Sequence, residues 1–545
     1  MTTDSTRTNG KQTTRRPRPL DVSFHDDPRV VKEAANEDYS THVVPLSWRS
    51  SRLSLTMTWY AVISGMFYLV TAATLAVTVG TVNTLIGIVL AVIVFGVVGG
   101  ALSRYAAHTG LTVALLSQRL FGLAGSVLAP LILAATALYY AVFESSVIAH
   151  ALHAYTGVLD IRIWYAVAVV TNLPMVIGGV RRWMDKFNGF LLPLYWGGLL
   201  VAVVLAAVKY PSKGWLTHVP DSAPDLSAPG WLYALFVYLG VFVFMMYTVD
   251  FARFGKPEDS RYHSVVTFGP VFYLFVYLAN GLIGIFLVMA AGTSGALSET
   301  AIGDTVINLM GISGLVVVWV TQSRINTANY YVASTNLEAL FTRLLRIRVP
   351  RVAALMLAGV LTYLFMLTDV LSYLLTALAW QGAFVVAWVG IALTHMWLSR
   401  HGDRDGLPEF RPGRVASFGP GAIVWLIVSV LGIAVYEGTG TFGTTWSTPL
   451  VLVLSIVLYT VAHRLGRPVA LDRPGDPRDE VEDIWETRVR CHTCDHSYIA
   501  VEMDRDPSTE DGAAICADCA GRSAAFRRAV LLEARTAPTG RPADR

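Results

Sequence analysis

The sequence predicts an all-α integral membrane protein with twelve transmembrane helices and a small C-terminal domain that binds a metal ion. Of its 545 residues, 54% are hydrophobic and only 15% are charged, and its mean hydropathy is +0.51. Soluble domains carry roughly a quarter charged residues. In addition, all four cysteines lie from residue 491 onward, outside the apolar region. These observations exclude an ordinary soluble fold.

The charged residues are concentrated at the two ends of the chain. Of the 81 Lys, Arg, Asp and Glu residues, 16 lie in residues 1–52 and 28 in residues 467–545, which leaves 37 for the 414 residues between them. So few charges cannot cover a water-facing surface of that size, so lipid is the solvent for much of the middle. The net charge of +3 is too small to indicate a nucleic-acid partner.

Composition divides the chain into five parts. We expect a partly disordered N-terminal tail at 1–52, with the disorder in 1–36, followed by a membrane domain with twelve spans at 53–466. A linker at 467–489, a zinc-ribbon-like domain at 490–535 and a disordered tail at 536–545 follow. The first 40 residues contain no apolar segment, so we expect no secretory signal and a cytoplasmic N-terminus.

Twelve apolar runs are each long enough to cross a bilayer as a complete helix, which needs about 18 or more residues. They lie near 54–79, 83–102, 122–150, 163–180, 189–208, 230–249, 264–291, 311–337, 352–368, 370–397, 418–436 and 447–464. The loops after even-numbered runs hold sixteen Lys and Arg residues, whereas the opposite loops hold only Arg162, Lys209 and Lys213. Cytoplasmic loops retain positive charge, so both termini are predicted on the cytoplasmic side of the plasma membrane.

Glycines in two spans indicate broken helices. Gly65 lies in the first span and Gly240 in the sixth, which is typical of two inverted five-helix repeats whose first helices are interrupted at a ligand. The backbone exposed beside Gly65 is therefore a candidate for ligand binding. Close helix packing is the alternative for either glycine.

Glu144 is a carboxylate at membrane depth, where charge usually marks a pathway or a paired site. Tyr140 precedes it by four residues and shares its helix face. A flat ring rich in N–H groups would stack on Tyr140 while Glu144 accepts its hydrogen bonds. The alternative is a protonated Glu144, or one paired with Arg324, that only ties helices together.

The eighth span is the most polar, so one side of it must face a cavity or other helices rather than lipid. Its polar residues are Gln322, Ser323, Arg324, Asn326 and Asn329. Interhelical hydrogen bonding is the alternative. At the exit of the sixth span, Asp250 is predicted to act as a gate with Arg253, three residues later, as its local ion-pair partner.

At three segments the chain resembles the nucleobase:cation symporter family, in its purine and cytosine permease branch. The segments are Glu-Asp-Tyr-Ser at 37–40 with Val-Pro at 44–45, Thr-Val-Asp-Phe-Ala-Arg-Phe-Gly at 248–255, and Arg-Ile-Asn at 324–326 followed by Asn329, Tyr331 and Ser334. The resemblance covers roughly residues 37–465. It implies a leucine-transporter-like fold of ten core helices plus two accessory helices. It also implies inward symport of a nucleobase or related cyclic amide with a cation.

The resemblance also assigns roles to residues. The stacking aromatic of the third span falls at Tyr140, and the amide that reads the substrate falls at Glu144, where an acid replaces it. The second stacking position falls near Val241, which is not aromatic, so Phe242 is the candidate. Polar reading from the eighth span, which also carries Gln322, falls to Asn326 and Asn329.

The coupling ion is predicted to be a proton, with sodium as the alternative. By this resemblance, the sodium-site hydroxyls of the eighth span fall at Ile325-Asn326, beside Arg324. An aliphatic side chain gives no oxygen to a hard cation, and a guanidinium would repel a sodium ion. We expect Arg324 to supply the sodium charge and Glu144 to take the proton.

The C-terminal segment contains two Cys-x-x-Cys pairs, Cys491 with Cys494 and Cys516 with Cys519. Four thiolates at this spacing predict a structural zinc ion, which a domain this small needs for stability. His492 or His496 replacing one thiol, and unliganded cysteines, are the alternatives. The domain either binds a cytoplasmic protein partner or steadies the tail.

Two functions remain open at this stage. The first is a secondary transporter for nucleobase-like solutes, without an organic cofactor. The second is a membrane receptor that senses a nucleobase and signals through the zinc ribbon. An enzyme is not expected, because the sequence contains no Ser-His-Asp set, HExxH motif or P-loop.

Overall fold

The chain forms two compact units, each described here by itself. The computed structural model describes residues 17–177, 184–210, 214–220, 225–290, 300–347, 349–368, 374–399, 406–466, 469–471 and 473–536. The membrane unit comprises residues 31–410 and 414–471, and the cysteine unit comprises residues 1–30, 411–413 and 472–544. Helix α1 (Pro28–Glu37) begins in the cysteine unit and ends in the membrane unit.

The membrane unit is built from helices in all its described parts, so that its backbone polar groups are paired within segments, as a lipid environment requires. After α1 its helices are α2 (Arg52–Trp59), α3 (Met66–Val79), α4 (Thr81–Thr109), α5 (Val113–Gly125), α6 (Leu128–Thr156), α7 (Ile161–Asn172), α8 (Pro174–Ile177), α9 (Asp185–Lys209), α10 (Gly230–Leu239), α11 (Val243–Ala252), α12 (Ser260–Tyr262), α13 (Pro270–Tyr273), α14 (Asn280–Ala290), α15 (Ala301–Met310), α16 (Ile312–Leu344), α17 (Arg351–Met366), α18 (Leu374–Leu398), α19 (Pro420–Gly438) and α20 (Thr441–Leu465).

Seven helical segments of the described chain are long and apolar enough to cross a membrane, or up to nine if two bent pairs each count as one span. The seven are 81–109, 128–156, 185–209, 257–290, 379–398, 420–438 and 441–465. The bent pairs are α2 with α3, at 45°, and α10 with α11, at 42°. Both bends lie where the sequence predicted interrupted helices, at the first and the sixth span.

Two segments differ from the sequence prediction. The third span begins at Leu128 rather than at residue 122, because residues 122–125 belong to α5, which is kinked at Gly122, where φ is 78°. The segment between the seventh and eighth spans, predicted as a loop, contains α15, which Gly311 ends with a φ of 60°. In both cases a glycine with a positive φ interrupts the helical backbone, at Gly122 within α5 and at Gly311 between α15 and α16.

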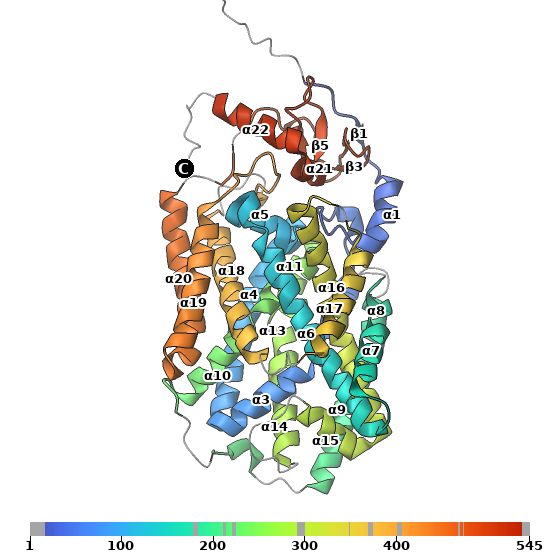
Figure 1. Cartoon of the computed structure of the whole chain (residues 1–545), viewed down its shortest axis with the longest axis vertical. Coiled ribbons are helices and arrows are strands. Elements are labelled where there is room, and N and C mark those ends of the chain that lie inside the picture. The colour runs from blue at the N-terminus through green and yellow to red at the C-terminus, as the bar shows by residue number, and fades with distance from the viewer. Residues whose placement is uncertain are drawn as a thin grey trace, which may run out of the picture. The chain divides into compact units, whose positions relative to one another are not determined.

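The centre of the membrane unit is formed by α6 and α16, which pack along each other. In Figure 1 they lie among the other helices of this unit, while α19 and α20 lie side by side at one edge. The segment of α16 from Thr321 to Leu340 is buried throughout, including its polar side chains. This helix is therefore surrounded by protein on the side that carries its polar residues.

The cysteine unit contains two small antiparallel sheets and two helices. In the first sheet β2 (Arg488–Arg490) lies between β1 (Val22–Ser23) and β3 (Ser497–Ile499), with Val22 opposite Val489 and Val489 opposite Tyr498. The second sheet pairs β4 (Met503–Arg505) with β5 (Ala514–Cys516), and α21 (Ala517–Arg522) and α22 (Ala524–Thr536) follow. Part of the N-terminal segment predicted to be disordered instead forms strand β1 and helix α1. Strand β1 is ordered by its pairing with β2.

Several predictions lie outside the described residues. They are the disorder of residues 1–16 and 537–545, and the loop charges at Arg181, Arg182, Lys213, Asp221, Glu299, Arg348, Arg400 and Arg404.

We predict that Gly284→Ala lowers the thermal stability of the detergent-solubilised protein. A Cβ at Gly284, in α14, would overlap the backbone of Leu69 in α3, whereas Gly197, in α9, has nothing within 4 Å of that position. Overpacking of this kind costs roughly 1–3 kcal/mol. The matched variant Gly197→Ala should leave the unfolding temperature unchanged or raise it, since alanine favours a helix. Equal unfolding temperatures for the two variants would contradict the tight packing of α3 on α14.

Candidate functional site

The site is built around the break in the first span. Residues Tyr60–Ser64 form a single 3₁₀ turn after α2, and Gly65 is extended, with φ −65° and ψ 129°, before α3 begins. The break is buried, and side chains of other helices bind its backbone. The carbonyl of Ile63 accepts hydrogen bonds from Asn280 Nδ2 at 2.7 Å and from the Tyr195 hydroxyl at 3.3 Å.

One amide joins this break to the buried carboxylate. The backbone N–H of Met66, the first residue of α3, donates to Gln322 Oε1 at 3.1 Å. Gln322 Nε2 in turn donates to Glu144 Oε2. Glu144 and Gln322 are both 0% exposed. The predicted site residues Gly65, Gln322 and Glu144 are therefore brought together, from three separate helical segments.

Gly65 is required at this point by close approach. A Cβ built on Gly65 would lie 2.6 Å from Ile325 Cδ1 and 3.2 Å from Glu144 Oε1. Any side chain here would push α16 or the carboxylate away from the break. Gly65 thus lies at the helix break and also allows close helix packing, the two roles that the sequence alone left as alternatives.

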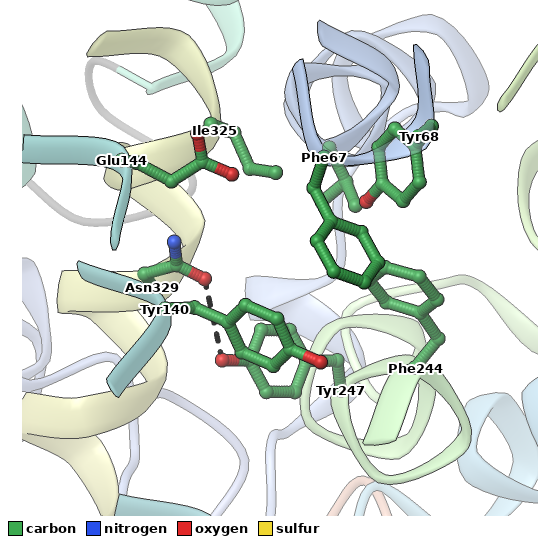
Figure 2. Close-up of a pocket in the computed structure, with 9 residues that line it drawn as sticks. Phe67, Tyr68, Tyr140, Glu144, Phe244, Tyr247, Ile325 and Asn329 are labelled. Carbon is green, nitrogen blue, oxygen red and sulfur yellow. Dashed lines mark hydrogen bonds between the residues drawn. The ribbon is translucent and has the colours of Figure 1, made fainter. Parts of the chain in front are cut away.

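A small cavity of about 10 Å³, roughly the space of one water molecule, lies beside this carboxylate. Small-molecule sites span roughly 300–1,000 Å³, so the walls of this cavity must move apart to admit a heterocycle. Its lining residues are Val62, Phe67, Tyr68, Tyr140, Glu144, Phe244, Tyr247, Ile325 and Asn329. Figure 2 shows Glu144 and Ile325 on one side of it, Phe67 and Tyr68 opposite, and Tyr140 and Tyr247 together along a third side.

Aromatic rings form most of the wall. The rings of Phe67 and Tyr140 meet edge to face, with centroids 6.0 Å apart and an interplanar angle of 83°. The ring centroid of Phe244 lies 5.8 Å from that of Tyr68 and 6.4 Å from that of Tyr247. Phe67, Tyr68 and Tyr247 were not among the residues predicted from the sequence. Phe67 and Tyr68 follow Gly65, the predicted helix break, by two and three residues, and this position could have identified them as lining residues.

Two amides of α16 extend the polar side of the cavity. Tyr247 donates its hydroxyl hydrogen to Asn329 Oδ1 at 3.3 Å, as Figure 2 shows. Asn329 Nδ2 donates to Asn326 Oδ1 at 3.2 Å, and Asn326 Nδ2 donates to Ser145 Oγ at 3.1 Å. Asn329 lines the cavity. Asn326 lies behind Asn329 and orients its side chain. The predicted pair is therefore one wall residue and one supporting residue.

Arg324 does not pair with Glu144 in the described part of the chain. Its Nη2 donates to the carbonyl of Tyr60 at 3.0 Å, on the turn that interrupts the first span. Its guanidinium also lies 5.8 Å from the centroid of the Tyr195 ring. The charge is 0% exposed and lies at the unwound backbone rather than in the cavity lining.

The structure separates Phe242 from the cavity. Phe242 is buried and packs against Phe95, with ring centroids 4.8 Å apart, and it is not one of the lining residues. The aromatic residue that α11 contributes to the wall is Phe244, two positions later. The difference arises at the bend between α10 and α11, which changes the helix face that reaches the cavity.

Within the described residues the carboxylate of Asp250 does not form the predicted local ion pair with Arg253, whose Nε donates instead to the backbone carbonyl of Asp250 at 3.0 Å. Asp250 accepts from the N–H of Val113 at 2.8 Å and from Asn336 Nδ2 at 3.0 Å, so it caps α5 and binds α16. The Arg253 guanidinium donates to the carbonyls of Asp38 and Tyr39, each at 2.9 Å. Both residues are buried, and they join α11 to other segments.

The four cysteines form a cluster in the cysteine unit. Their Sγ atoms all lie within 4.8 Å of one another. The N–H of Cys516 donates to Cys491 Sγ at 3.3 Å, and hydrogen bonds from the other thiols lower the pKa of Cys491. His492 points away from the cluster, because its Nε2 bonds Asp506 Oδ2 at 2.9 Å. The cysteine cluster is thus a possible metal site formed by sulfur atoms alone.

Several solved structures have a similar fold. Mhp1, a nucleobase-cation-symport-1 family transporter in a closed conformation with bromovinylhydantoin bound, matches with 16% identity and a TM-score of 0.63, over 84% of this chain and 99% of that one. A Na⁺-coupled sialic acid symporter matches with 12% identity and a TM-score of 0.56, over 79% and 92%. MhsT in complex with L-phenylalanine matches with 14% identity and a TM-score of 0.51, over 76% and 99%.

These likenesses confirm the leucine-transporter-like fold. No curated protein matches the chain. Residues 44–411 match the model of a family described as permeases for cytosine/purines, uracil, thiamine and allantoin. This match covers most of the membrane unit and confirms the family that the sequence resembled, and it identifies a membrane transporter rather than an enzyme. The chain therefore belongs to the family of permeases for cytosine/purines, uracil, thiamine and allantoin, and it is a multi-pass permease of the nucleobase type.

Proposed function

We propose that this permease imports a nucleobase or a related cyclic amide by symport with a proton, through alternating access. The observation that carries the proposal is the small cavity at the broken first span, where a buried carboxylate lies opposite aromatic rings. A flat heterocycle has two apolar faces and a polar edge, and this cavity offers both kinds of surface. The other features of the membrane unit are consistent with such a pathway.

The proposed topology has twelve spans with both termini in the cytoplasm. The seven candidate spans and two bent pairs account for nine. The apolar segment Ile161–Ile177, the apolar helix α17 and the 33-residue helix α16 would be the other three. A polar helix such as α16 can cross the bilayer where other helices surround it. The first ten spans would form two inverted repeats, each opening with one of the bent pairs.

In the proposed binding mode, the ring stacks on Tyr140 and its edge faces Glu144 and Asn329. The carboxylate accepts hydrogen bonds, and the Asn329 amide both donates and accepts. Phe67 and Phe244 would enclose the ring from the opposite side, and Gln322, Asn326 and Gly65 would act by holding these groups in place. Glu144 in place of an amide favours a substrate edge rich in N–H donors.

We predict that Tyr140→Ala weakens nucleobase binding while Tyr140→Phe does not. Stacking of a base on an aromatic ring is worth roughly 1–3 kcal/mol, which corresponds to about 5- to 150-fold in affinity. The measurement is a competition panel of labelled bases, cyclic amides and thiamine in proteoliposomes that contain the full chain. Unchanged affinity in Tyr140→Ala would remove the stacking role of this residue.

Proton coupling follows from the placement of two charges. Arg324 donates to a carbonyl of the interrupted first span, so a fixed positive charge lies against backbone oxygens that would otherwise suit a hard cation. In Glu144, Oε2 accepts from Gln322, whose orientation is set by the Met66 N–H. A proton taken up by Glu144 would therefore reside on Oε1. Protonation also removes the cost of a buried charge while the proton and the substrate cross the membrane together.

We predict that an inward proton gradient drives substrate accumulation and that a sodium gradient does not. Glu144→Gln keeps the size of the side chain but cannot carry the coupling proton. This variant should therefore exchange substrate across the membrane and fail to accumulate it. The readouts are counterflow and gradient-driven uptake in the same proteoliposomes. Accumulation driven by sodium and indifferent to pH would refute proton coupling, and binding without any flux would favour a nucleobase receptor.

The cysteine cluster is proposed to hold a structural zinc ion. Four thiolates at about 2.3 Å from zinc stand about 3.8 Å apart in a tetrahedron, which fits sulfur atoms that all lie within 4.8 Å. The backbone N–H groups that donate to Cys491 Sγ and Cys516 Sγ suit thiolates rather than thiols. Zinc would order a domain whose described strands are only two or three residues long.

We predict that the purified chain binds one zinc ion and that the double variant Cys516→Ser, Cys519→Ser binds none. His492→Ala serves as the control, because His492 bonds Asp506 rather than facing the cluster. Metal content is measured by elemental mass spectrometry after exchange against a weak chelator. A reduced chain that takes up no zinc, or a His492→Ala variant that loses it, would contradict a four-cysteine site.

A further inference from the structure

Four polar side chains of the membrane unit form a continuous hydrogen-bonded row that starts at the cavity. Tyr247 of α11 donates its hydroxyl hydrogen to Asn329 Oδ1 at 3.3 Å (Figure 2). Asn329 Nδ2 donates to Asn326 Oδ1 at 3.2 Å, and Asn326 Nδ2 donates to Ser145 Oγ of α6 at 3.1 Å. We call these four residues the polar relay. Each is at most 3% exposed, so bulk water does not compete for these hydrogen bonds.

The inner half of the polar relay faces the cavity and the outer half does not. Tyr247 and Asn329 are lining residues, whereas Asn326 and Ser145 are not among those the described chain contributes. Asn326 and Asn329 lie three residues apart and share one face of α16. The outer half can therefore act on a bound molecule only by changing how the inner half is oriented.

The polar relay can run in either direction. Its two ends are hydroxyls, which donate or accept, and its two middle members are amides, which exchange donor and acceptor when they turn over. In the reversed direction Ser145 donates to Asn326 Oδ1, and Asn326 Nδ2 donates to Asn329 Oδ1. Asn329 Nδ2 then donates to the Tyr247 hydroxyl oxygen. Both directions contain one hydrogen bond from a hydroxyl and two from amides, so neither is favoured by the number or kind of its bonds.

The other hydrogen-bonded arm at the cavity has a fixed direction. Gln322 accepts from the backbone N–H of Met66, which can only donate, and it donates to Glu144 Oε2. Turning this amide over would place two donors face to face at one end. The cavity therefore combines one arm of fixed direction with one that is reversible.

The direction of the polar relay determines what Tyr247 offers to a bound molecule. While Tyr247 donates its single hydrogen to Asn329, its oxygen can only accept a further hydrogen bond. In the reversed direction that oxygen accepts from Asn329, and the hydroxyl hydrogen is available to a ligand. An amino group on a heterocycle needs the first arrangement and an oxo group needs the second.

We propose that the polar relay reverses with the substrate, so that the permease binds heterocycles with either an amino or an oxo group at this edge. The substrate selects the direction in which the relay runs. Ser145 and Asn326 are positioning residues, since they act only through Asn329 and Tyr247. The inference rests on the proposed function, because it requires the heterocycle to bind in this cavity.

Matched pairs of bases test the reversal in the unmodified chain. Cytosine and uracil have the same shape but exchange donor and acceptor at one edge, and adenine and hypoxanthine do the same. A relay of fixed direction would leave a buried polar group unpaired with one member of each pair, which costs roughly 5- to 150-fold in affinity. We expect the members of at least one pair to bind within about five-fold of each other. The measurement is equilibrium binding of the four radiolabelled bases to the full chain in detergent.

Ser145→Ala tests whether the outer half acts on the cavity. Without this hydroxyl, the direction described above leaves an N–H of Asn326 unpaired, whereas the reversed direction leaves only its carbonyl unpaired, which is the milder defect. The variant should therefore shift the affinity ratio of a pair toward the oxo member by about five-fold or more. Ser146→Ala, at the adjacent buried serine outside the relay, is the matched control and should shift nothing.

Tyr247→Phe distinguishes the relay from a general disturbance of α6. If the relay is correct, the shift caused by Ser145→Ala disappears in the double variant Ser145→Ala, Tyr247→Phe. A shift that persists there, that is absent in Ser145→Ala or that appears equally in Ser146→Ala would overturn the relay. So would discrimination beyond five-fold in both pairs by the unmodified chain, and in each case the proposed function would stand. Binding of none of the four bases would instead refute the proposed substrate class, and with it the relay as a substrate reader.

Discussion

The interrupted backbone of the first span is the constraint on which the membrane unit depends. A helix that breaks inside a bundle leaves N–H and carbonyl groups that lipid cannot satisfy. Side chains of two helices supply the missing partners. Gln322 of α16 binds the Met66 N–H, Asn280 of α14 binds the Ile63 carbonyl, and Arg324 of α16 binds the Tyr60 carbonyl. The polarity of α16 is thus the counterpart of the break, and neither is stable without the other.

This arrangement also determines the chemistry of the cavity. Because the Met66 N–H fixes the orientation of the Gln322 amide, the amide must present a donor to Glu144. The carboxylate is therefore held by the same helix break that a ligand would approach. A movement of α3 relative to α16, as alternating access requires, would change the hydrogen bonding of Glu144. In the proposed symport, substrate position and proton affinity would then be properties of one connected network rather than of separate sites.

The sequence predicted buried positions well where a residue type is costly in lipid. It could not decide between neighbouring apolar side chains that could each line the cavity. Glu144, Gln322 and Gly65 could be predicted, because a buried charge, an amide and a helix-breaking glycine each need a reason at membrane depth. Phe242 and Phe244 could not be told apart, since both are buried and only the bend between α10 and α11 decides which ring reaches the cavity. The partners of Arg253 were also hidden. They are carbonyls of Asp38 and Tyr39, whose backbone conformation no side-chain pattern encodes.

The pairing of β1 with β2 is a further case that local sequence cannot reveal, because it joins residues more than 460 positions apart. Its consequence is that the cysteine unit draws on three stretches of chain, residues 17–30, 411–413 and 473–536. Arg411 shows how the middle stretch is held, since its guanidinium binds both carboxylate oxygens of Asp476 at 2.7 Å. A small unit with such short strands would gain much of its stability from a metal ion at the proposed site.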